Sequence, residues 1–422
     1  MLIMGKTQKI NFLIIVIYFS IIAGYFFGED SIGGAYRDFN GHQHIAEKFN
    51  ENFILTLLNY DELGHRHSPL FYIFKSLVID FGENFHRLFF LHLFLLIPLF
   101  FYKSLKLTYP KVDKYYLKIF SLILLLFPTI RSYSIWPDPH LLGVLFFTIS
   151  IYFYLKFKFI EKKKHLKNSL LNTFFLALAA YCSPNFGVFV IFFLFDFFKK
   201  YKFSNKIFFI LLLNFLLSIP FFYYLFVLDI NFIFNDVGWD VGENFYSLNN
   251  IFNKFIIIIS IFFIYLLPLL VSKELDYKFA KISNSKIEIS IYLIVFVIAC
   301  YFFDFSSVYK LTNSGGGVIY NLSNYIFNNN YLLFIICFFT YLYLIQAFKF
   351  DRKNLILFTI LILSNPQITI WQANFSPTIF FLIFLLFNSN FKKEFFKLRT
   401  IYICYIYFFL YLVVSISKKM II

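Results

Sequence analysis

The chain has 422 residues, of which 60% are hydrophobic, 24% are aromatic and only 14% are charged. This composition excludes an ordinary soluble domain, and the recurring long apolar runs predict a polytopic all-α membrane protein. The formal net charge of +15 does not indicate nucleic-acid binding, because most Lys and Arg residues fall in alternate segments on one side of the predicted spans. That distribution follows the positive-inside rule.

We predict about thirteen membrane spans within a single transmembrane domain over residues 1–422. The N-terminus is placed in the cytoplasm, and the first span is expected to be an uncleaved anchor because no small-residue cleavage site follows it. The predicted spans lie near residues 10–27, 86–104, 116–134, 138–156, 169–183, 185–199, 207–228, 251–271, 288–304, 330–348, 354–369, 374–389 and 400–416.

The first long polar break, residues 28–85, is predicted to be an outer loop that contains two amphipathic surface helices. The first is expected over 38–60, where apolar residues recur at spacings of three and four on one face (Ile45, Phe49, Phe53, Ile54, Leu57 and Leu58). The second is expected over 68–81, beginning at a Ser-Pro pair. The i, i+2 spacing of His42 and His44 puts them on different sides of a helix, which favours interfacial solvation over a shared metal ion.

Three short motifs follow the early acids in order: SPLFY at 68–72, WPD in a short outer turn at 136–138, and SPNFG at 183–187 between two spans. Over about residues 10–200, this order on one side of the membrane resembles the GT-C superfamily of glycosyltransferases. These enzymes use polyprenyl-phosphate sugars and include protein mannosyltransferases and the lipid A aminoarabinose transferase.

The resemblance implies a membrane glycosyltransferase with an inverting mechanism. The donor would be a polyprenyl-phosphate-linked sugar, and the acceptor a lipid, a glycan or a protein. The active site would face the periplasm from a bacterial inner membrane. The four cysteines show no zinc or disulfide spacing, and neither the sugar nor a divalent metal cofactor is specified.

The resemblance also implies that an acid in the first outer loop activates the acceptor hydroxyl. We assign this role to Asp38, with Glu29 and Asp30 as alternatives, and we assign a second, positioning acid to Asp138. Inverting transfer needs a base near the attacking hydroxyl, and the acid of the first loop would supply it. The alternative interpretation is purely structural, because Asp38 also suits the start of a surface helix and Asp138 suits the N-cap of a span.

Cationic groups are expected to hold the donor phosphate at the membrane interface. The predicted candidates are Arg66, Arg87, Arg131 and His140, the last because it lies two residues after Asp138, and Lys75 lies near the same face. A lipid-phosphate donor needs no nucleotide-binding fold, only stabilisation of the charge on the departing phosphate.

A multi-pass transporter or lipid flippase is the main competing function. Such a protein is expected to carry charged residues in the middle of its spans, and these spans are nearly free of them. A polysaccharide polymerase or ligase would be expected to place its main outer loop in the second half of the chain, whereas here it comes first.

Overall fold

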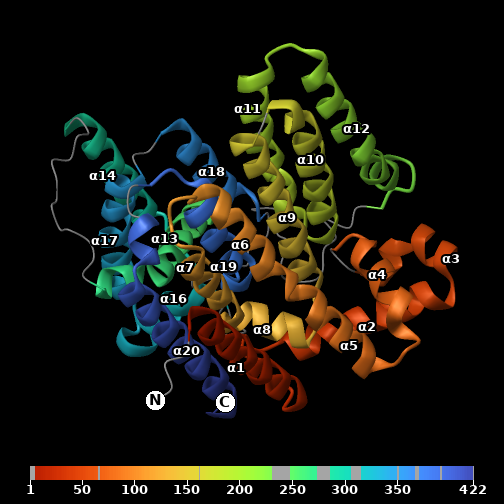
Figure 1. The fold of residues 1–422 in the computed structure, drawn as a ribbon, viewed down its shortest axis with the longest axis horizontal. Coiled ribbons are helices and arrows are strands. Elements are labelled where there is room, and N and C mark those ends of the chain that lie inside the picture. Colours follow the sequence, from red (N-terminus) through yellow and green to blue (C-terminus); the bar gives the residue numbers. More distant parts are fainter. Residues whose placement is uncertain are drawn as a thin grey trace. The chain divides into compact units, whose positions relative to one another are not determined.

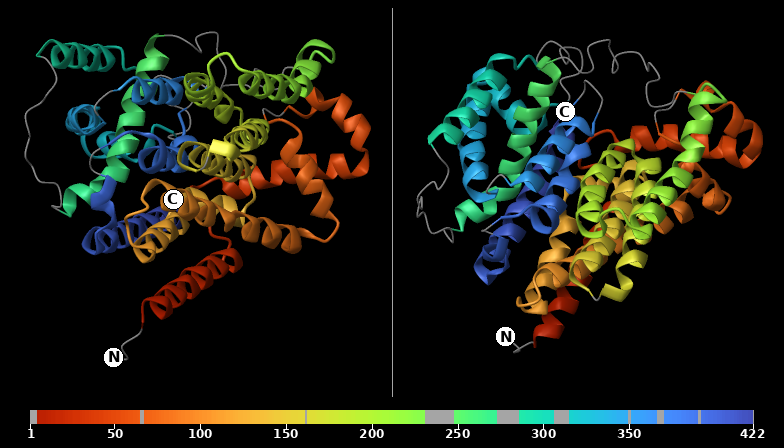
Figure 2. Two further views of the ribbon diagram at one scale, coloured as in Figure 1. Left: turned by 45° about the horizontal axis from the view of Figure 1, so that its top comes forward. Right: turned by 90° about the horizontal axis from the view of Figure 1, so that it is seen from above.

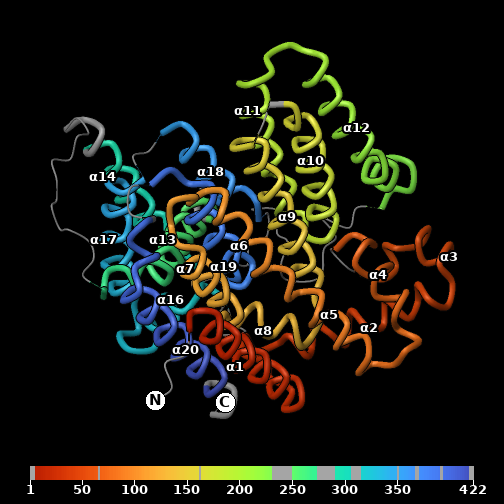
Figure 3. The backbone as a smooth tube through the Cα atoms, viewed as in Figure 1, coloured from red at the N-terminus to blue at the C-terminus, as the bar shows by residue number. Residues whose placement is uncertain are grey.

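A computed structural model of the chain describes residues 5–64, 67–160, 162–230, 248–272, 286–305, 315–348, 351–365, 370–389 and 392–421. All regular structure in these residues is helical (Figure 1), which confirms the all-α prediction. The remaining residues are the grey segments of the chain trace in Figure 3.

The chain forms two compact units, residues 1–235 with 404–422, and residues 236–403. The first unit contains, in order, α1 (Lys6–Phe26), α2 (Ala35–Glu51), α3 (Phe53–Leu58), η1 (Tyr60–Leu63), α4 (Leu70–Ile79), α5 (Glu83–Phe94), α6 (Leu96–Thr108), α7 (Lys114–Leu122), η2 (Ile123–Leu126), α8 (Pro128–Ile135), α9 (Pro139–Phe159), η3 (Lys162–Lys164), α10 (His165–Cys182), η4 (Pro184–Phe189), α11 (Val190–Tyr201), α12 (Asn205–Phe226) and most of α20 (Leu398–Ile421).

The second unit contains the helices between α12 and α20. They are α13 (Leu248–Val271), α14 (Lys286–Tyr301), α16 (Gly317–Phe327), α17 (Tyr331–Phe348), α18 (Arg352–Leu363), α19 (Gln372–Phe381), η5 (Leu382–Leu386) and η6 (Lys392–Phe396). None of the predicted site residues falls in this unit, so the site is described from the first unit alone.

The described residues contain seven helices that are long and apolar enough to cross a membrane, or eight if one bent pair is a single span. This supports a membrane protein but does not confirm thirteen spans. The predicted span 116–134 is bent by 65° between α7–η2 and α8, because Pro128 lacks the N–H that would continue the helix. The predicted span 185–199 divides into the short η4 and the 12-residue α11.

Helices form in both of the ranges for which surface helices were predicted, but the first is divided. α2 ends before Asn52, whose side chain accepts a hydrogen bond from the backbone N–H of Leu55 at 3.1 Å and so caps the separate α3. The break turns Phe53 and Ile54 outward, so they are exposed rather than on the buried face with Ile45. The second surface helix, α4, lies inside the predicted range 68–81.

The elements that carry the site pack in sequence. α2 packs on α4, α4 on α5, and α5 on α8 and α9, while α9 and α10 run side by side (Figures 1 and 2). Inside the α9–α10 pair, the Asn172 side-chain amide donates to the backbone carbonyl of Ser150 at 3.0 Å. This buried polar contact fixes the register of the two helices, because an unpaired amide there would be costly.

Candidate functional site

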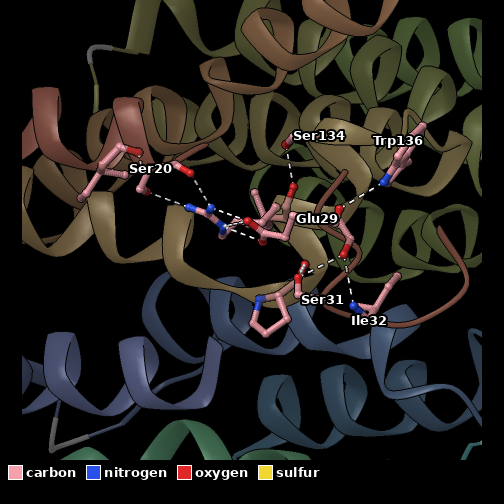
Figure 4. A network of polar contacts seen from close by, with 11 residues as sticks. Ser20, Glu29, Ser31, Ile32, Ser134 and Trp136 are labelled. Atoms are coloured by element: carbon pink, nitrogen blue, oxygen red, sulfur yellow. Dashed lines mark hydrogen bonds and ion pairs between the residues drawn. The ribbon is translucent and has the colours of Figure 1, made fainter. Parts of the chain in front are cut away.

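Glu29 and Arg131 form a buried ion pair. Arg131 Nε lies 2.8 Å from Glu29 Oε1. The side chain of Glu29 is 6% exposed and that of Arg131 is 4% exposed. The rest of the guanidinium bonds Ser20, through its hydroxyl and its backbone carbonyl, both at 2.9 Å (Figure 4). Both predicted site residues are therefore already engaged with other protein groups.

The ion pair is built into the turn between α1 and α2. A side chain at Gly24 would overlap the Glu29 carboxylate and would have to displace it. The indole N–H of Trp136 donates to the Glu29 backbone carbonyl at 3.1 Å (Figure 4). The arrangement joins the end of α1 to α8 and its following turn, which is a structural role.

Asp30 caps the start of α2. Its Oδ1 accepts from the backbone N–H groups of Gly33 at 3.0 Å and Ala35 at 3.2 Å, and its Oδ2 accepts from Gly34 at 2.9 Å. An acidic side chain that accepts several backbone N–H groups satisfies donors that the start of a helix leaves without partners. Asp30 is therefore fully occupied as a cap.

Asp138 is buried and held from two directions. Its Oδ1 accepts from the backbone N–H of His140 at 2.7 Å, which caps α9, and its Oδ2 lies 3.2 Å from Nε2 of His42. Burial acts to raise the pKa of Asp138, but the hydrogen bond and electrostatic attraction of His42 outweigh it and hold the pKa below its usual value. Asp138 is therefore a fixed carboxylate.

His42 links α2 to Asp138. Its Nδ1 lies 3.1 Å from the hydroxyl of Tyr72 on α4, and its side chain is buried. Since a carboxylate only accepts, the Nε2 atom that faces Asp138 carries a proton. The interpretation of His42 as a solvated interfacial group is wrong, because α2 turns this position toward α4 and α9.

Asp38 lies one helical turn before His42 on α2, and it is exposed. Within the described part of the chain its carboxylate has no hydrogen-bond or ion-pair partner. Partial enclosure by the surrounding protein raises the pKa of Asp38, and the negative charge of Asp138 raises it further. An open carboxylate with increased proton affinity is suited to accept a proton from a substrate.

Three nitrogen-bearing side chains surround the ring of Phe39, and we call Phe39, Lys75, His86 and Arg87 the Phe39 cluster. Lys75 Nζ lies 4.0 Å from the ring centroid, the His86 ring stacks at 5.5 Å, and Arg87 Cζ lies at 5.9 Å. Lys75 and His86 are 0% exposed and Arg87 is 7% exposed.

The Phe39 cluster contains several buried nitrogen atoms without a hydrogen-bond partner in the described part of the chain. Among the residues described, Lys75 Nζ, both ring nitrogens of His86 and Arg87 Nη2 have no hydrogen-bond partner of acceptable geometry. The other Arg87 nitrogens are used, because Nε donates to the Ile135 carbonyl at 3.0 Å and Nη1 to Glu83 at 3.2 Å. Buried donors without acceptors are unfavourable, so this cluster suits an anion that would supply acceptors.

His140 and His67 also lie near Asp138. His140 Nδ1 lies 3.2 Å from the Ser183 hydroxyl and its ring stacks on Phe186, whereas its Nε2 has no partner among the described residues. Burial lowers the pKa of His67 to about 4, so this ring is neutral at pH 7. No three His, Cys, Asp or Glu side chains of the described chain lie close enough together to hold a metal ion.

The structure thus brings Asp38, Asp138 and His140 to one region and pairs Glu29 with Arg131 elsewhere. Arg66 lies outside the described residues. Sequence reasoning missed His42 and His86 as parts of the site. For His42 a signal was present, because the buried positions of α2 at 35, 39, 42, 46 and 49 alternate in steps of four and three.

No protein-family model, no curated protein and no solved structure matches this chain.

Proposed function

We propose that this chain is a membrane glycosyltransferase that moves a sugar from a polyprenyl-phosphate donor to an acceptor hydroxyl. One observation carries the proposal: of the four acids predicted for the site, only Asp38 has an open carboxylate, and Asp138 beside it is locked in place. An enzyme of this kind needs one acid that is free to take a proton and a second group with a fixed charge.

In the proposed step, the acceptor oxygen attacks the anomeric carbon and its proton passes to the Asp38 carboxylate. The bond between the anomeric carbon and the phosphate oxygen breaks, and the lipid phosphate leaves with the electron pair. Attack from the face opposite the leaving group inverts the anomeric centre. The charge of Asp138 raises the proton affinity of Asp38, which improves Asp38 as a base.

The donor phosphate is proposed to bind at the Phe39 cluster. Arg87 is the predicted phosphate ligand that keeps an unused guanidinium nitrogen, and Lys75 and His86 add further donors. Arg131 is excluded from this role because Glu29 and Ser20 occupy it. Arg87 lies at the start of a helix pair long enough to span a membrane, a suitable depth for a phosphate whose lipid tail stays in the bilayer.

We place residues 28–85 on the outer side of a bacterial inner membrane, with about thirteen spans in total, some of them bent or short. This placement follows the charge distribution of the sequence. It puts Asp38, Asp138 and the Phe39 cluster at one membrane face, where a lipid-linked sugar and an extracytoplasmic acceptor would meet.

The direct test incubates the purified protein with a panel of polyprenyl-phosphate sugars and measures release of the free lipid phosphate. Release with at least one sugar, absent in Asp38→Asn, supports the proposal. Parallel samples with and without a chelator determine the metal requirement. The outcome that would replace the transferase with the flippase alternative has two parts. No lipid phosphate is released with any sugar, and the protein in liposomes moves a labelled lipid between leaflets.

A further inference from the structure

Lys75 is a buried amine without a counterion in contact. Its side chain is 0% exposed and its Nζ has no hydrogen-bond partner within the described ranges. The neighbour of that nitrogen is the face of the Phe39 ring at 4.0 Å. A ring face attracts a cation less strongly than water or a carboxylate does, so this environment favours the uncharged amine. Burial accordingly lowers the pKa of Lys75 to about 7.

The charged groups around Lys75 act on it only at a distance. Three carboxylates favour its protonation: Glu47 on α2, Glu83 at the start of α5 and Asp138 at the start of α9. Glu83 is engaged with Arg87, and Asp138 with His42. His86 and Arg87, the nitrogen-bearing members of the cluster on α5, supply no negative charge to Lys75. The described surroundings therefore lack the anion that a charged Lys75 needs.

We propose that above neutral pH Lys75 is uncharged in the ligand-free protein and takes up one proton from solvent when the donor phosphate enters the Phe39 cluster. The anionic oxygen supplies the missing counterion, so the amine becomes an ammonium ion and the pair is buried with no net charge. This inference rests on the proposed function, since the ligand is the phosphodiester of the lipid-linked sugar. It predicts that donor binding weakens as pH rises above neutrality, because binding then requires uptake of a proton from a solvent with a lower proton concentration.

Isothermal titration calorimetry in buffers of different ionisation enthalpy measures this proton directly. The probe is a short-chain prenyl methyl phosphodiester, which does not titrate near neutral pH, so any proton taken up belongs to the protein. With a ligand-free pKa of about 7 and a much higher one in the complex, the expected uptake is about 0.9 proton at pH 8 and about 0.1 at pH 6.

Two variants separate the charge of Lys75 from its proton uptake. Lys75→Arg carries a permanent charge, so it should bind the probe without proton uptake at pH 8. Lys75→Met is similar in length and has no charge, so it should bind at least tenfold more weakly, again without uptake. His86→Gln should retain the uptake. Lys48→Met, at an exposed position on α2, is the matched control and should behave as wild type. Size-exclusion chromatography in detergent establishes that each variant is folded.

Each remaining outcome overturns a defined part of the argument. Binding at pH 8 without proton uptake, or uptake that persists in both Lys75 variants, rejects the role of Lys75 and leaves the transferase proposal standing. Loss of uptake in His86→Gln alone transfers the role to His86 and also rejects the inference. If the phosphodiester binds at no pH and no sugar is transferred, both the inference and the proposed function fail.

Discussion

His42 Nε2 lies 3.2 Å from Asp138 Oδ2, although 96 positions separate the two residues in the chain. The contact joins α2 to the N-terminus of α9, and both side chains are buried. Asp38 lies one turn before His42 on α2. The same contact therefore brings Asp138 close enough for its negative charge to raise the pKa of Asp38. The effect of the Asp138 charge on Asp38 therefore depends on His42, which is hydrogen-bonded to Asp138.

Asp38→Asn should remove most of the turnover and leave donor binding intact. The amide keeps the size of the side chain but cannot take a proton, and a general base typically contributes about 10²–10⁴-fold in rate. The measurement is release of lipid phosphate, with binding of the donor checked separately by calorimetry. Asp61→Asn, an exposed acid in η1 of the same loop, is the matched control and should retain normal turnover. Normal turnover in Asp38→Asn would remove Asp38 as the base.

The pH dependence of turnover should have an acidic limb that Asp138 controls. Asp38 must be ionised to act as a base, so turnover falls as pH decreases through its pKa, which lies above the usual 3.8. Asp138→Asn still caps α9 but removes a negative charge, so the pKa of Asp38 falls and the limb moves to lower pH. Rate profiles over about pH 4 to 8 measure the shift. A limb that stays in place would show that Asp138 does not act on the base.

The Glu29–Arg131 pair should matter for stability rather than for chemistry. Breaking a buried ion pair leaves one charge without its partner, so Glu29→Gln or Arg131→Met alone should reduce the free energy of unfolding by about 3–5 kcal/mol. The double variant should lose less than the sum of the two, and denaturant unfolding in detergent measures all three. The exposed pair of Lys48 and Glu51 is the control, for which less than about 1 kcal/mol is expected. Lost turnover at unchanged stability in Glu29→Gln would instead make Glu29 the base.

The topology is testable with single cysteines at exposed positions. Ser31 precedes α2 but is unsuitable for thiol labelling, because its side chain is buried and its hydroxyl donates to the Pro128 carbonyl at 3.0 Å. Glu62→Cys and Lys163→Cys, in a background without the four native cysteines, are better placed because both positions are exposed. A membrane-impermeant maleimide should label position 62 in intact cells and position 163 only after lysis. The reverse pattern would invert the assignment of sides.

Long helices with clear ends were predicted well from the sequence. The predicted spans 138–156 and 207–228 correspond to α9 (Pro139–Phe159) and α12 (Asn205–Phe226), because continuous apolar runs and a cap such as Asp138 are local signals. The break at Pro128 was missed because average hydropathy remains high through it. A predicted continuous helix over 38–60 was wrong for a related reason, since the cap that Asn52 gives α3 is a detail of side-chain geometry.

The side-chain partners of the candidate site residues were harder to predict than the elements that carry them. Asp38 lies on α2 and Asp138 at the start of α9, and a shared site for the two acids stays a prediction. The partner of each acid was not predictable, because Glu29 and Arg131 are 102 positions apart and only the tertiary fold pairs them. His42 was misinterpreted because only large apolar residues were used to define the buried face of α2, whereas Ala35 and Ala46 also belong to it.

All eight residues of α8 are buried, and the helix bonds both the segment that precedes α2 and the start of α5. Arg131 binds Glu29, the Ser132 hydroxyl accepts from the backbone N–H of Ile32 at 3.1 Å, and the Ile135 carbonyl accepts from Arg87. Loss-of-function alleles recovered after random mutagenesis should therefore accumulate in α8 as well as in α2. Those in α8 should regain function at a lower growth temperature, since they weaken assembly of the loop and leave its reactive groups unchanged.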